Sequence, residues 1–149
     1  MRKIYLISAI VATFMLGSCN DKAKDVKLPS TDTDPSEQVN VTVDFNSMKA
    51  DTVYNYKGGD NMVLSKMAPL GNNKAIYSIV PPGSSVGYHT HETDMEIVYV
   101  LQGTATVRMD STTLVYTPGM VHYCPKGRSH SISNLGEENL VSFNVIATQ

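Results

Sequence analysis

The sequence predicts an all-β fold, with one domain built as a barrel or sandwich of antiparallel strands. Three observations predict it. Short segments of alternating or β-branched apolar residues recur along the chain, clusters of Gly, Pro, Asn and Asp separate them, and no segment after the N-terminal part shows convincing helical periodicity. The polar N-terminal part leaves about 110 residues for the folded part, which is the size of a single domain.

The first 18 residues have the layout of an export signal. Arg2 and Lys3 precede an uncharged apolar run over residues 4–16, which is too short to span a membrane comfortably. The following Leu-Gly-Ser-Cys, which ends at Cys19, resembles the bacterial lipobox. That resemblance implies that residues 1–18 are a lipoprotein signal peptide, and that Cys19 carries lipid and anchors the protein to a membrane of the cell envelope, on its periplasmic or cell-surface side. Ordinary cleavage nearby, with release of the protein, is the alternative.

Residues 19–40 are rich in Asp, Lys, Ser, Thr and Pro, and hold too few apolar residues to order themselves. We expect a flexible tether there. The formal net charge of the chain is −2, and loss of Arg2 and Lys3 with the signal makes it −4. No basic patch indicates a nucleic-acid partner. With Cys19 lipidated, Cys124 has no cysteine to pair with, and we expect it to pack as a small buried apolar group.

The strands expected in the domain of residues 41–149 follow its apolar and polar patterns. Residues 39–45 alternate strictly, which predicts a strand that pairs with the barrel edge or with a second subunit. Residues 51–56 are ambiguous between a strand and a turn. Further strands are expected, in order, at residues 62–67, 74–80, 96–101, 104–109, 113–116, 121–123, 129–132 and 140–147, with turn residues between them.

Two clusters of polar residues interrupt this β-rich sequence, and together they contain all four histidines. The first reads Gly83-x5-His89-x-His91-x4-Glu96-x6-Gly103, and the second reads Gly119-x5-Pro125-x-Gly127-x2-His130-x3-Asn134. Residues two apart on a strand point to the same face, so the imidazoles of His89 and His91 lie side by side. With Glu96 nearby and His130 from a distant strand, they form a good ligand set for a divalent transition metal that keeps positions open for water or substrate.

These clusters match, position by position, the two signature motifs of the cupin superfamily, and the resemblance covers roughly the last two thirds of the chain. It implies a single jelly-roll (cupin) β-barrel of antiparallel strands. It also implies one divalent metal ion inside the barrel, bound by His89, His91, Glu96 and His130. Iron, manganese, nickel, copper and zinc all stay open. The resemblance further implies a homodimer, with residues 39–45 as the candidate exchange segment.

The remaining motif residues are expected to shape turns and strand ends rather than take part in chemistry: Gly83, Gly103, Gly119, Pro125, Gly127 and Asn134. Side chains that could form a substrate pocket or a second layer around the metal are Tyr88, Met95, Tyr99, Arg108, Met109, His122 and Tyr123. Most of these residues would be present without any role in a pocket. Aromatic and Met side chains of a small barrel usually form the core, and an Arg usually lies on the solvated face.

Metal ligation alone does not fix the reaction. Resemblance to small cupins of the quercetin dioxygenase type implies an oxidoreductase that acts on an enediol-like small molecule, with Glu96 as the catalytic group that moves protons. Three alternatives stay open: a sugar isomerase or epimerase that uses the metal as a Lewis acid, a non-catalytic envelope protein that binds a small molecule or a metal, and a barrel with a structural role in a larger assembly.

Overall fold

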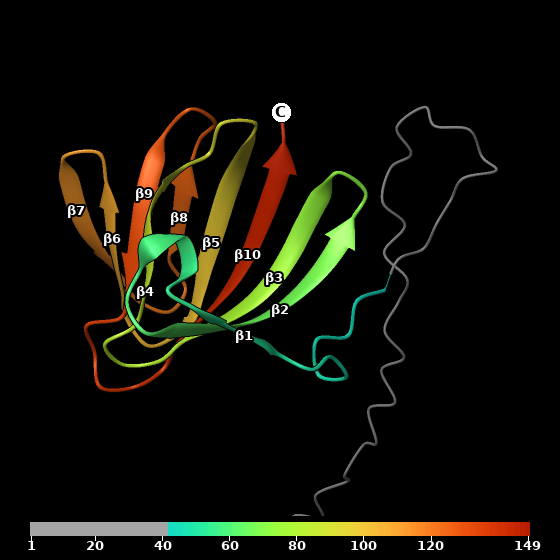
Figure 1. Cartoon of the computed structure of the whole chain (residues 1–149), viewed down its shortest axis with the longest axis horizontal. Coiled ribbons are helices and arrows are strands. Elements are labelled where there is room, and N and C mark those ends of the chain that lie inside the picture. The colour runs from blue at the N-terminus through green and yellow to red at the C-terminus, as the bar shows by residue number, and fades with distance from the viewer. Residues whose placement is uncertain (1–41) are drawn as a thin grey trace, which may run out of the picture. The chain divides into compact units, whose positions relative to one another are not determined.

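A computed structural model describes residues 42–149, which form two antiparallel β-sheets (Figure 1). The elements are β1 (Asp51–Tyr54), the 3-10 helix η2 (Tyr56–Gly58), β2 (Met62–Leu70), β3 (Asn73–Val80), β4 (Ser85–Thr90), β5 (Asp94–Gln102), β6 (Ala105–Met109), β7 (Thr112–Tyr116), β8 (Val121–Cys124), β9 (Ser129–Ser133) and β10 (Leu140–Thr148). The expected signal peptide and tether, with Cys19, lie outside the described residues. Within residues 42–149, no helix has the length and apolar character needed to cross a membrane.

The two sheets are built from strands that are distant in sequence. The larger has six strands in the order β1-β2-β3-β10-β5-β8, and the smaller has four in the order β4-β9-β6-β7. Every recorded strand pair is antiparallel. The chain therefore passes repeatedly from one sheet to the other, and the all-β jelly-roll fold predicted from the sequence is confirmed.

The core lies between the sheets and follows the alternation of the strands. Along β5, for example, Val98 and Val100 point inward and are 1 % exposed, whereas Tyr99 between them is 39 % exposed. The apolar residues buried together between the sheets are Val63, Val80, Val86, Val98, Val100, Ala105, Val107, Ile132 and Leu140. Burial of these side chains is the main favourable contribution to the stability of such a sandwich.

The motif residues expected to shape turns do so. Gly83, Gly103, Gly119 and Gly127 all have positive φ angles, between 71° and 90°. The requirement for glycine is strongest at position 103, because a Cβ on Gly103 would also lie 2.5 Å from the backbone oxygen of Asn139.

Asn134 ties the end of β9 to two other segments. Its side chain is fully buried. Its Nδ2 donates hydrogen bonds to the backbone oxygens of Val80 (2.8 Å) and Glu138 (2.7 Å), and its Oδ1 accepts one from the Gly136 N–H (3.0 Å). The prediction that Asn134 bonds to backbone at the end of its strand is therefore confirmed.

The strand expected at residues 39–45 is wrong for its described part, residues 42–45. The Asp44 carboxylate accepts a hydrogen bond from the Asn46 N–H (2.9 Å), so the backbone turns instead of extending. The Phe45 ring packs near Tyr77 (6.1 Å between centroids) and Phe143 (6.0 Å). The alternating pattern predicted a strand wrongly, because Phe45 is half-buried by packing on side chains of β3 and β10 and not by pairing in a sheet.

The ambiguous residues 51–56 divide between a strand and a turn. Strand β1 ends at Tyr54, and Asn55 and Lys57 then adopt left-handed backbone angles (φ 49° and 56°) around η2. Beyond η2, Gly59 lies so close to Gly87 of β4 that a Cβ on either would come within 2.7 Å of the backbone nitrogen of the other. This contact between two glycines brings the Tyr56 segment down onto β4.

Candidate metal centre

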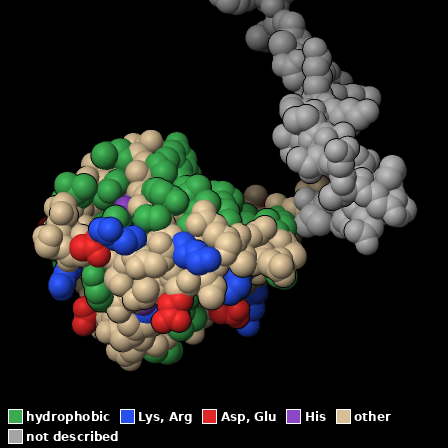
Figure 2. Space-filling view, turned by 90° about the horizontal axis from the view of Figure 1, so that it is seen from above, with side chains coloured by type: hydrophobic (Ala, Val, Ile, Leu, Met, Phe, Trp, Pro, Cys, Tyr) green, Lys and Arg blue, Asp and Glu red, His purple; other side chains and the backbone are tan. Residues whose placement is uncertain are grey.

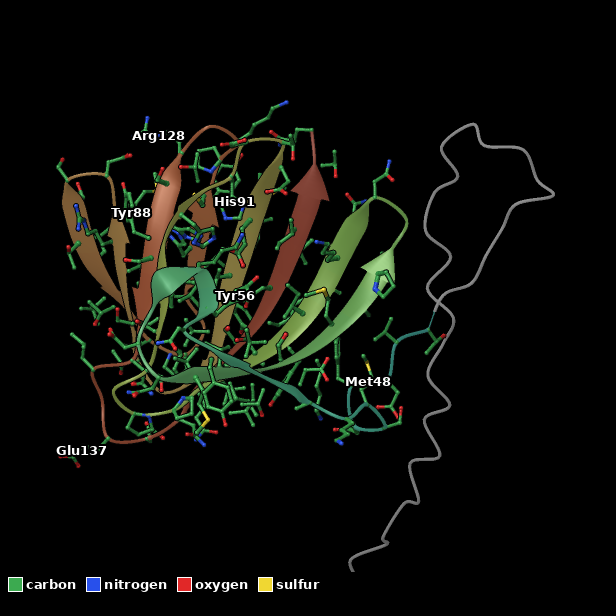
Figure 3. All side chains as sticks on the ribbon, in the orientation of Figure 1. Met48, Tyr56, Tyr88, His91, Arg128 and Glu137 are labelled. Atoms are coloured by element: carbon green, nitrogen blue, oxygen red, sulfur yellow. The ribbon has the colours of Figure 1, made fainter. Side chains whose placement is uncertain are left out.

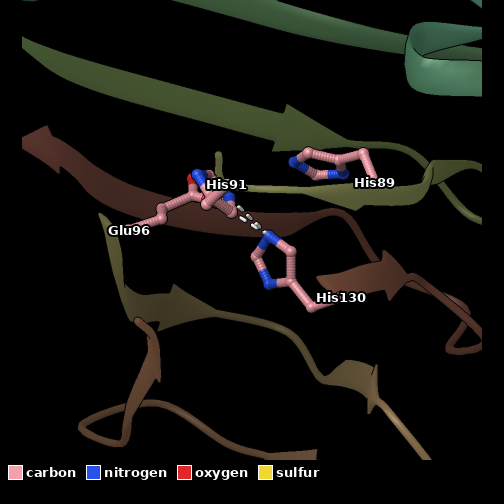
Figure 4. Close-up of side chains that lie close together, drawn as sticks. All are labelled: His89, His91, Glu96 and His130. Atoms are coloured by element: carbon pink, nitrogen blue, oxygen red, sulfur yellow. Dashed lines mark hydrogen bonds and ion pairs between the residues drawn. The ribbon is translucent and has the colours of Figure 1, made fainter. Parts of the chain in front are cut away.

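Four side chains that the sequence singled out meet inside the domain (Figure 4). His89 lies on β4, Glu96 on β5 and His130 on β9, while His91 directly follows β4. One nitrogen or oxygen atom from each of the four lies within 4.8 Å of the others. Nε2 of His91 is 3.0 Å from Nε2 of His130, and Oε2 of Glu96 is 3.3 Å and 3.1 Å from these two nitrogens. His91, Glu96 and His130 are buried, and His89 is half-buried.

Strand pairing explains why residues distant in sequence converge. His89 and His130 are register partners between β4 and β9, and the register of β4 shifts between Val86 and His89. The segment after β4 is then fixed by two backbone hydrogen bonds. The His91 N–H donates to the Arg128 oxygen (3.0 Å), and the Gly127 N–H donates to the His91 oxygen (2.6 Å). The Pro-x-Gly turn of the second motif thus holds His91 of the first.

Hydrogen bonds on the far side of two imidazoles set the direction of their lone pairs. Nδ1 of His89 lies 2.8 Å from the Gly87 backbone oxygen, and Nδ1 of His91 lies 2.6 Å from a carboxylate oxygen of Asp94. Carbonyl and carboxylate oxygens only accept, so both Nδ1 atoms carry the proton. In the neutral rings both Nε2 atoms therefore present lone pairs toward the cluster, which is the usual arrangement of metal-binding histidines.

The third imidazole is oriented by another histidine. Nδ1 of His130 lies 2.9 Å from Nε2 of His122, and Nδ1 of His122 lies 3.3 Å from the Tyr116 hydroxyl. His122 is 2 % exposed. Burial lowers the pKa of His122 to about 4, so this ring is neutral at pH 7 and has a lone pair available for the His130 Nδ1–H.

The charges of the cluster favour a bound cation. Burial alone would raise the pKa of Glu96, but hydrogen bonds from His130 and His91, made when their Nε2 atoms carry a proton in place of a metal, lower it to about 2, so its carboxylate is ionised at neutral pH. A hydrogen bond to Glu96 and a second to Asp94 raise the pKa of His91 against the effect of burial. Burial lowers the pKa of His89. A negative oxygen and converging nitrogens thus surround one point.

These distances fit the ligand set of one metal ion. Neighbouring ligands of an octahedral ion at about 2.1 Å lie about 3.0 Å apart. The three separations among His91, Glu96 and His130 are 3.0, 3.1 and 3.3 Å. Three imidazoles and one carboxylate suit a divalent first-row transition metal, without selecting one of them.

A cavity adjoins the candidate ligands in the interior of the domain. His89 and Glu96 form part of its wall, and its volume including the open mouth is about 590 Å³. Most of the wall is apolar and comes from both sheets, with Val53, Val63, Met67, Val86, Ile132 and Ile146 among its residues. Tyr56, on the short helix η2, completes it (Figure 3). An apolar lining with a few polar groups is typical of a small-molecule site.

The pocket residues suggested by the sequence are placed elsewhere, and none of them lines this cavity. Tyr88, Tyr99 and Tyr123 are exposed, and the Arg108 guanidinium lies 4.9 Å from the centre of the Tyr88 ring on the outside of the smaller sheet. Together with Val107 and Arg128, the residues Met109, His122 and Tyr123 line a second hollow. Met95 is partly buried. Of the seven residues, His122 is the one in hydrogen-bond contact with a candidate ligand.

Several residues of the site were not singled out from the sequence. Asn144 on β10 donates a hydrogen bond to Oε1 of Glu96 (2.9 Å), and Asp94 accepts one from His91. A signal was available for Asn144, because it is a polar residue in the middle of an apolar strand. Tyr116 and Tyr56 carried no such signal, since an aromatic residue in a β-protein is usually core.

Comparison with known proteins gives consistent matches. The sequence profile of the Cupin domain matches residues 76–146. The chain is 31 % identical over 118 residues to the oxalate-binding protein of Thermotoga maritima, which covers 74 % of this chain and 96 % of the relative. A crystal structure from Thermotoga maritima described as a predicted oxalate decarboxylase superposes with a TM-score of 0.70 and 28 % identity, over 73 % of this chain and all of that one. The cupin domain of Schizosaccharomyces pombe Cnp3 shares the fold, at 19 % identity and a TM-score of 0.61, over 73 % of this chain and 74 % of that one.

Proposed function

The chain belongs to the cupin family, and we propose that it binds one divalent transition metal ion and uses it to hold a small molecule in the adjoining cavity. The ligands would be His89, His91, Glu96 and His130. The single observation that carries the proposal is their convergence, with one ligand atom from each within 4.8 Å of the others. When bound, the ion would supply Lewis-acid or redox chemistry, according to its identity.

The surrounding residues would prepare the ligands and the small molecule. Gly87 and Asp94 hold the Nδ1 protons of two histidines, so their Nε2 atoms need no reorganisation to bind a metal. Asn144 holds Oε1 of Glu96 and leaves Oε2 directed at the histidines. The apolar walls of the cavity would exclude water around a bound molecule and strengthen its polar contacts.

For catalysis, we propose dioxygenase-type oxidation of an enediol-like molecule as the first candidate reaction. Glu96 supports it, because this carboxylate lies in the cavity wall. A carboxylate at that place can accept a proton from an enolic hydroxyl within hydrogen-bond reach. Lewis-acid isomerisation of a sugar would use the same residues.

Binding without turnover is the second candidate. The Thermotoga maritima relative is named an oxalate-binding protein. Oxalate has two carboxylates that can chelate a divalent ion, so the candidate ligands could retain it through the metal without any reaction.

Metal content and turnover separate these candidates. The protein would be stripped of metal, reloaded in turn with Fe²⁺, Mn²⁺, Ni²⁺, Cu²⁺ and Zn²⁺, and analysed by elemental mass spectrometry, with oxygen uptake followed on catechol and a flavonol. One equivalent of metal with oxygen uptake supports the dioxygenase. One equivalent with oxalate binding and no turnover supports the binding protein. Failure of every ion to bind at stoichiometric amounts would refute the metal-centred function.

We also propose that Cys19 anchors the protein to a membrane of the cell envelope. The lipobox-like residues before it support this proposal. Changing Cys19 to Ala should abolish incorporation of labelled palmitate and partition into detergent. Unchanged membrane association of the variant would contradict it.

Homodimer formation is a separate proposal, supported by apolar surface. Hydrophobic side chains gather on one side of the domain (Figure 2). Tyr99 and Leu101 on β5 and Val121 and Tyr123 on β8 are each between 39 % and 54 % exposed. Light scattering of the protein without Cys19 should give twice the monomer mass, and Tyr99→Lys should halve it.

A further inference from the structure

The interior cavity has a polar strip on one wall. Ser65 of β2 and Ser78 of β3 are register partners, and both line the cavity. Ser142 of β10 continues the same row, because it pairs with Ser78. Asn144, two residues further along β10, also lines the cavity. Serines and an asparagine thus occupy inward positions on three neighbouring strands of the larger sheet, where apolar residues would ordinarily be expected.

Asn144 provides the strongest indication of a ligand. Its side chain is 7 % exposed, and its Nδ2 must face the Glu96 carboxylate because that group can only accept. Its Oδ1 is therefore fixed in orientation, and it is the one buried side-chain nitrogen or oxygen without a hydrogen-bond partner in the described part of the chain. A buried acceptor without a donor destabilises the folded protein, which favours any molecule that brings a donor to it.

The opposite part of the wall is apolar. Val86 of β4 and Ile132 of β9, both on the smaller sheet, line it. Among the residues that line the cavity there is no Lys or Arg, and the one carboxylate is that of Glu96. The cavity thus offers acceptors and an apolar surface, and no lysine or arginine side chain of its own.

We propose that this cavity binds an uncharged, largely apolar molecule whose hydroxyl group donates a hydrogen bond to Oδ1 of Asn144. The inference rests on the proposed function, and it names the ligand class for the same site. The apolar body of the ligand packs against the wall formed by Val86 and Ile132, while its hydroxyl faces the polar strip. Asn144 is thus a residue that determines specificity.

Matched probes test the hydroxyl directly. Phenol and anisole have the same ring, but anisole lacks the donor. Binding of each, and of oxalate, would be measured by ligand-observed NMR and calorimetry on the metal-free and the Zn²⁺-loaded protein. One added hydrogen bond predicts that phenol binds about three- to tenfold more tightly than anisole to both forms. Oxalate should not bind the metal-free protein measurably.

Variants assign the preference to Asn144. Asn144→Leu should bring the phenol-to-anisole ratio close to one, because it removes the acceptor and keeps a similar volume. Met67→Ala, at the cavity wall but without a polar group, should change the affinity for both probes alike and leave their ratio as in the wild type. The ratio also distinguishes recognition from a structural effect, since a distorted cavity weakens both probes together.

Two results would overturn the inference. One is equal affinity of the wild type for phenol and anisole, and the other is a ratio that Asn144→Leu leaves unchanged. Metal content is measured separately, so failure of the metal-centred function can be distinguished from failure of the proposed ligand class. Stoichiometric metal with no phenol preference refutes the ligand class alone. A phenol preference in a protein that binds no metal refutes the metal-centred function and leaves the ligand class standing.

Discussion

Nε2 of His122 lies 2.9 Å from Nδ1 of His130, on the side of that imidazole opposite its candidate metal-binding nitrogen. The two rings are stacked, with 5.1 Å between their centroids. Nδ1 of His122 in turn lies 3.3 Å from the Tyr116 hydroxyl. If Tyr116 accepts from His122, then His122 accepts from His130, and the lone pair of His130 is directed at the metal position. The orientation of a ligand is thus controlled by two residues that do not touch the metal.

We therefore expect His122→Phe to lower metal affinity by about ten- to a hundredfold, the range seen when partners of metal ligands are removed. Phe keeps the buried ring and removes both nitrogens. Competition with a chelating dye would give the affinity, and the electron paramagnetic resonance spectrum of the Cu²⁺-loaded variant should also change. Tyr116→Phe should have a smaller effect in the same direction. An unchanged spectrum and affinity for His122→Phe would show that the pair is only packing.

Removal of two ligands should abolish metal binding without unfolding the domain. His89→Ala/His91→Ala leaves the apolar side chains between the sheets untouched, and these supply most of the stability. Elemental analysis should find less than a tenth of the wild-type metal content, with an unchanged far-ultraviolet circular dichroism spectrum. Tyr88→Phe is the matched control on the same strand, because its ring faces Arg108 on the outside. Full metal content in the double variant would contradict the ligand assignment.

Asn134→Ala should destabilise the fold by about 2–4 kcal/mol, because it leaves buried backbone groups unpaired. Val80 and Glu138 each lose a donor, and Gly136 loses an acceptor. Urea unfolding at constant m-value would measure the loss. Asn139→Ala is the control in the same loop, where the side chain is exposed, and its effect should stay within about 0.5 kcal/mol.

Gly103→Ala should destabilise more than Gly119→Ala. Both glycines have positive φ, 75° and 90°, so both substitutions cost about 1 kcal/mol for the backbone conformation. A Cβ at Gly103 also lies 2.5 Å from the Asn139 oxygen, whereas at Gly119 nothing lies within 4 Å. Overpacking of this kind adds about 1–3 kcal/mol. Thermal unfolding of both variants would show the difference, and equal losses would rule out the steric part.

Cys124 should react slowly with iodoacetamide, and the rate should keep rising above pH 9. The residue is fully buried, and burial, together with the charge of Glu96, raises the pKa of its thiol to about 11. A raised pKa lowers the thiolate fraction at pH 8 by about a hundredfold relative to a thiol of pKa 9. Mass spectrometry of the alkylated protein from pH 7 to 11 would follow the reaction. A rate that levels off near pH 9 would contradict the raised pKa.

The residues that chemistry constrains most were the ones most readily predicted. His89, His91, Glu96 and His130 stand at motif spacing with the turn glycines, so the ligand cluster and the jelly roll could be anticipated before any coordinates. The same holds for Asn134, whose type suits backbone hydrogen bonding at a strand end.

The cavity could not be predicted in the same way. Which face of a strand a tyrosine occupies depends on register and bulges, and so Tyr88 and Tyr99 were candidates although both point outward. Asn144 and Tyr116 act through hydrogen bonds to residues on other strands, and such pairings are set by the tertiary fold. The alternation at residues 39–45 was overridden at Asp44 by a local turn.

The close contact of Gly59 with Gly87 joins the segment before β2 to strand β4 of the smaller sheet. All four candidate ligands lie at or after His89, while Val53, Tyr56 and Val63 reach the cavity from earlier in the sequence. Substitutions at these three residues can therefore reshape the cavity without replacing any atom that would bind the metal. The choice of small molecule and the choice of metal are thus carried by different stretches of one chain.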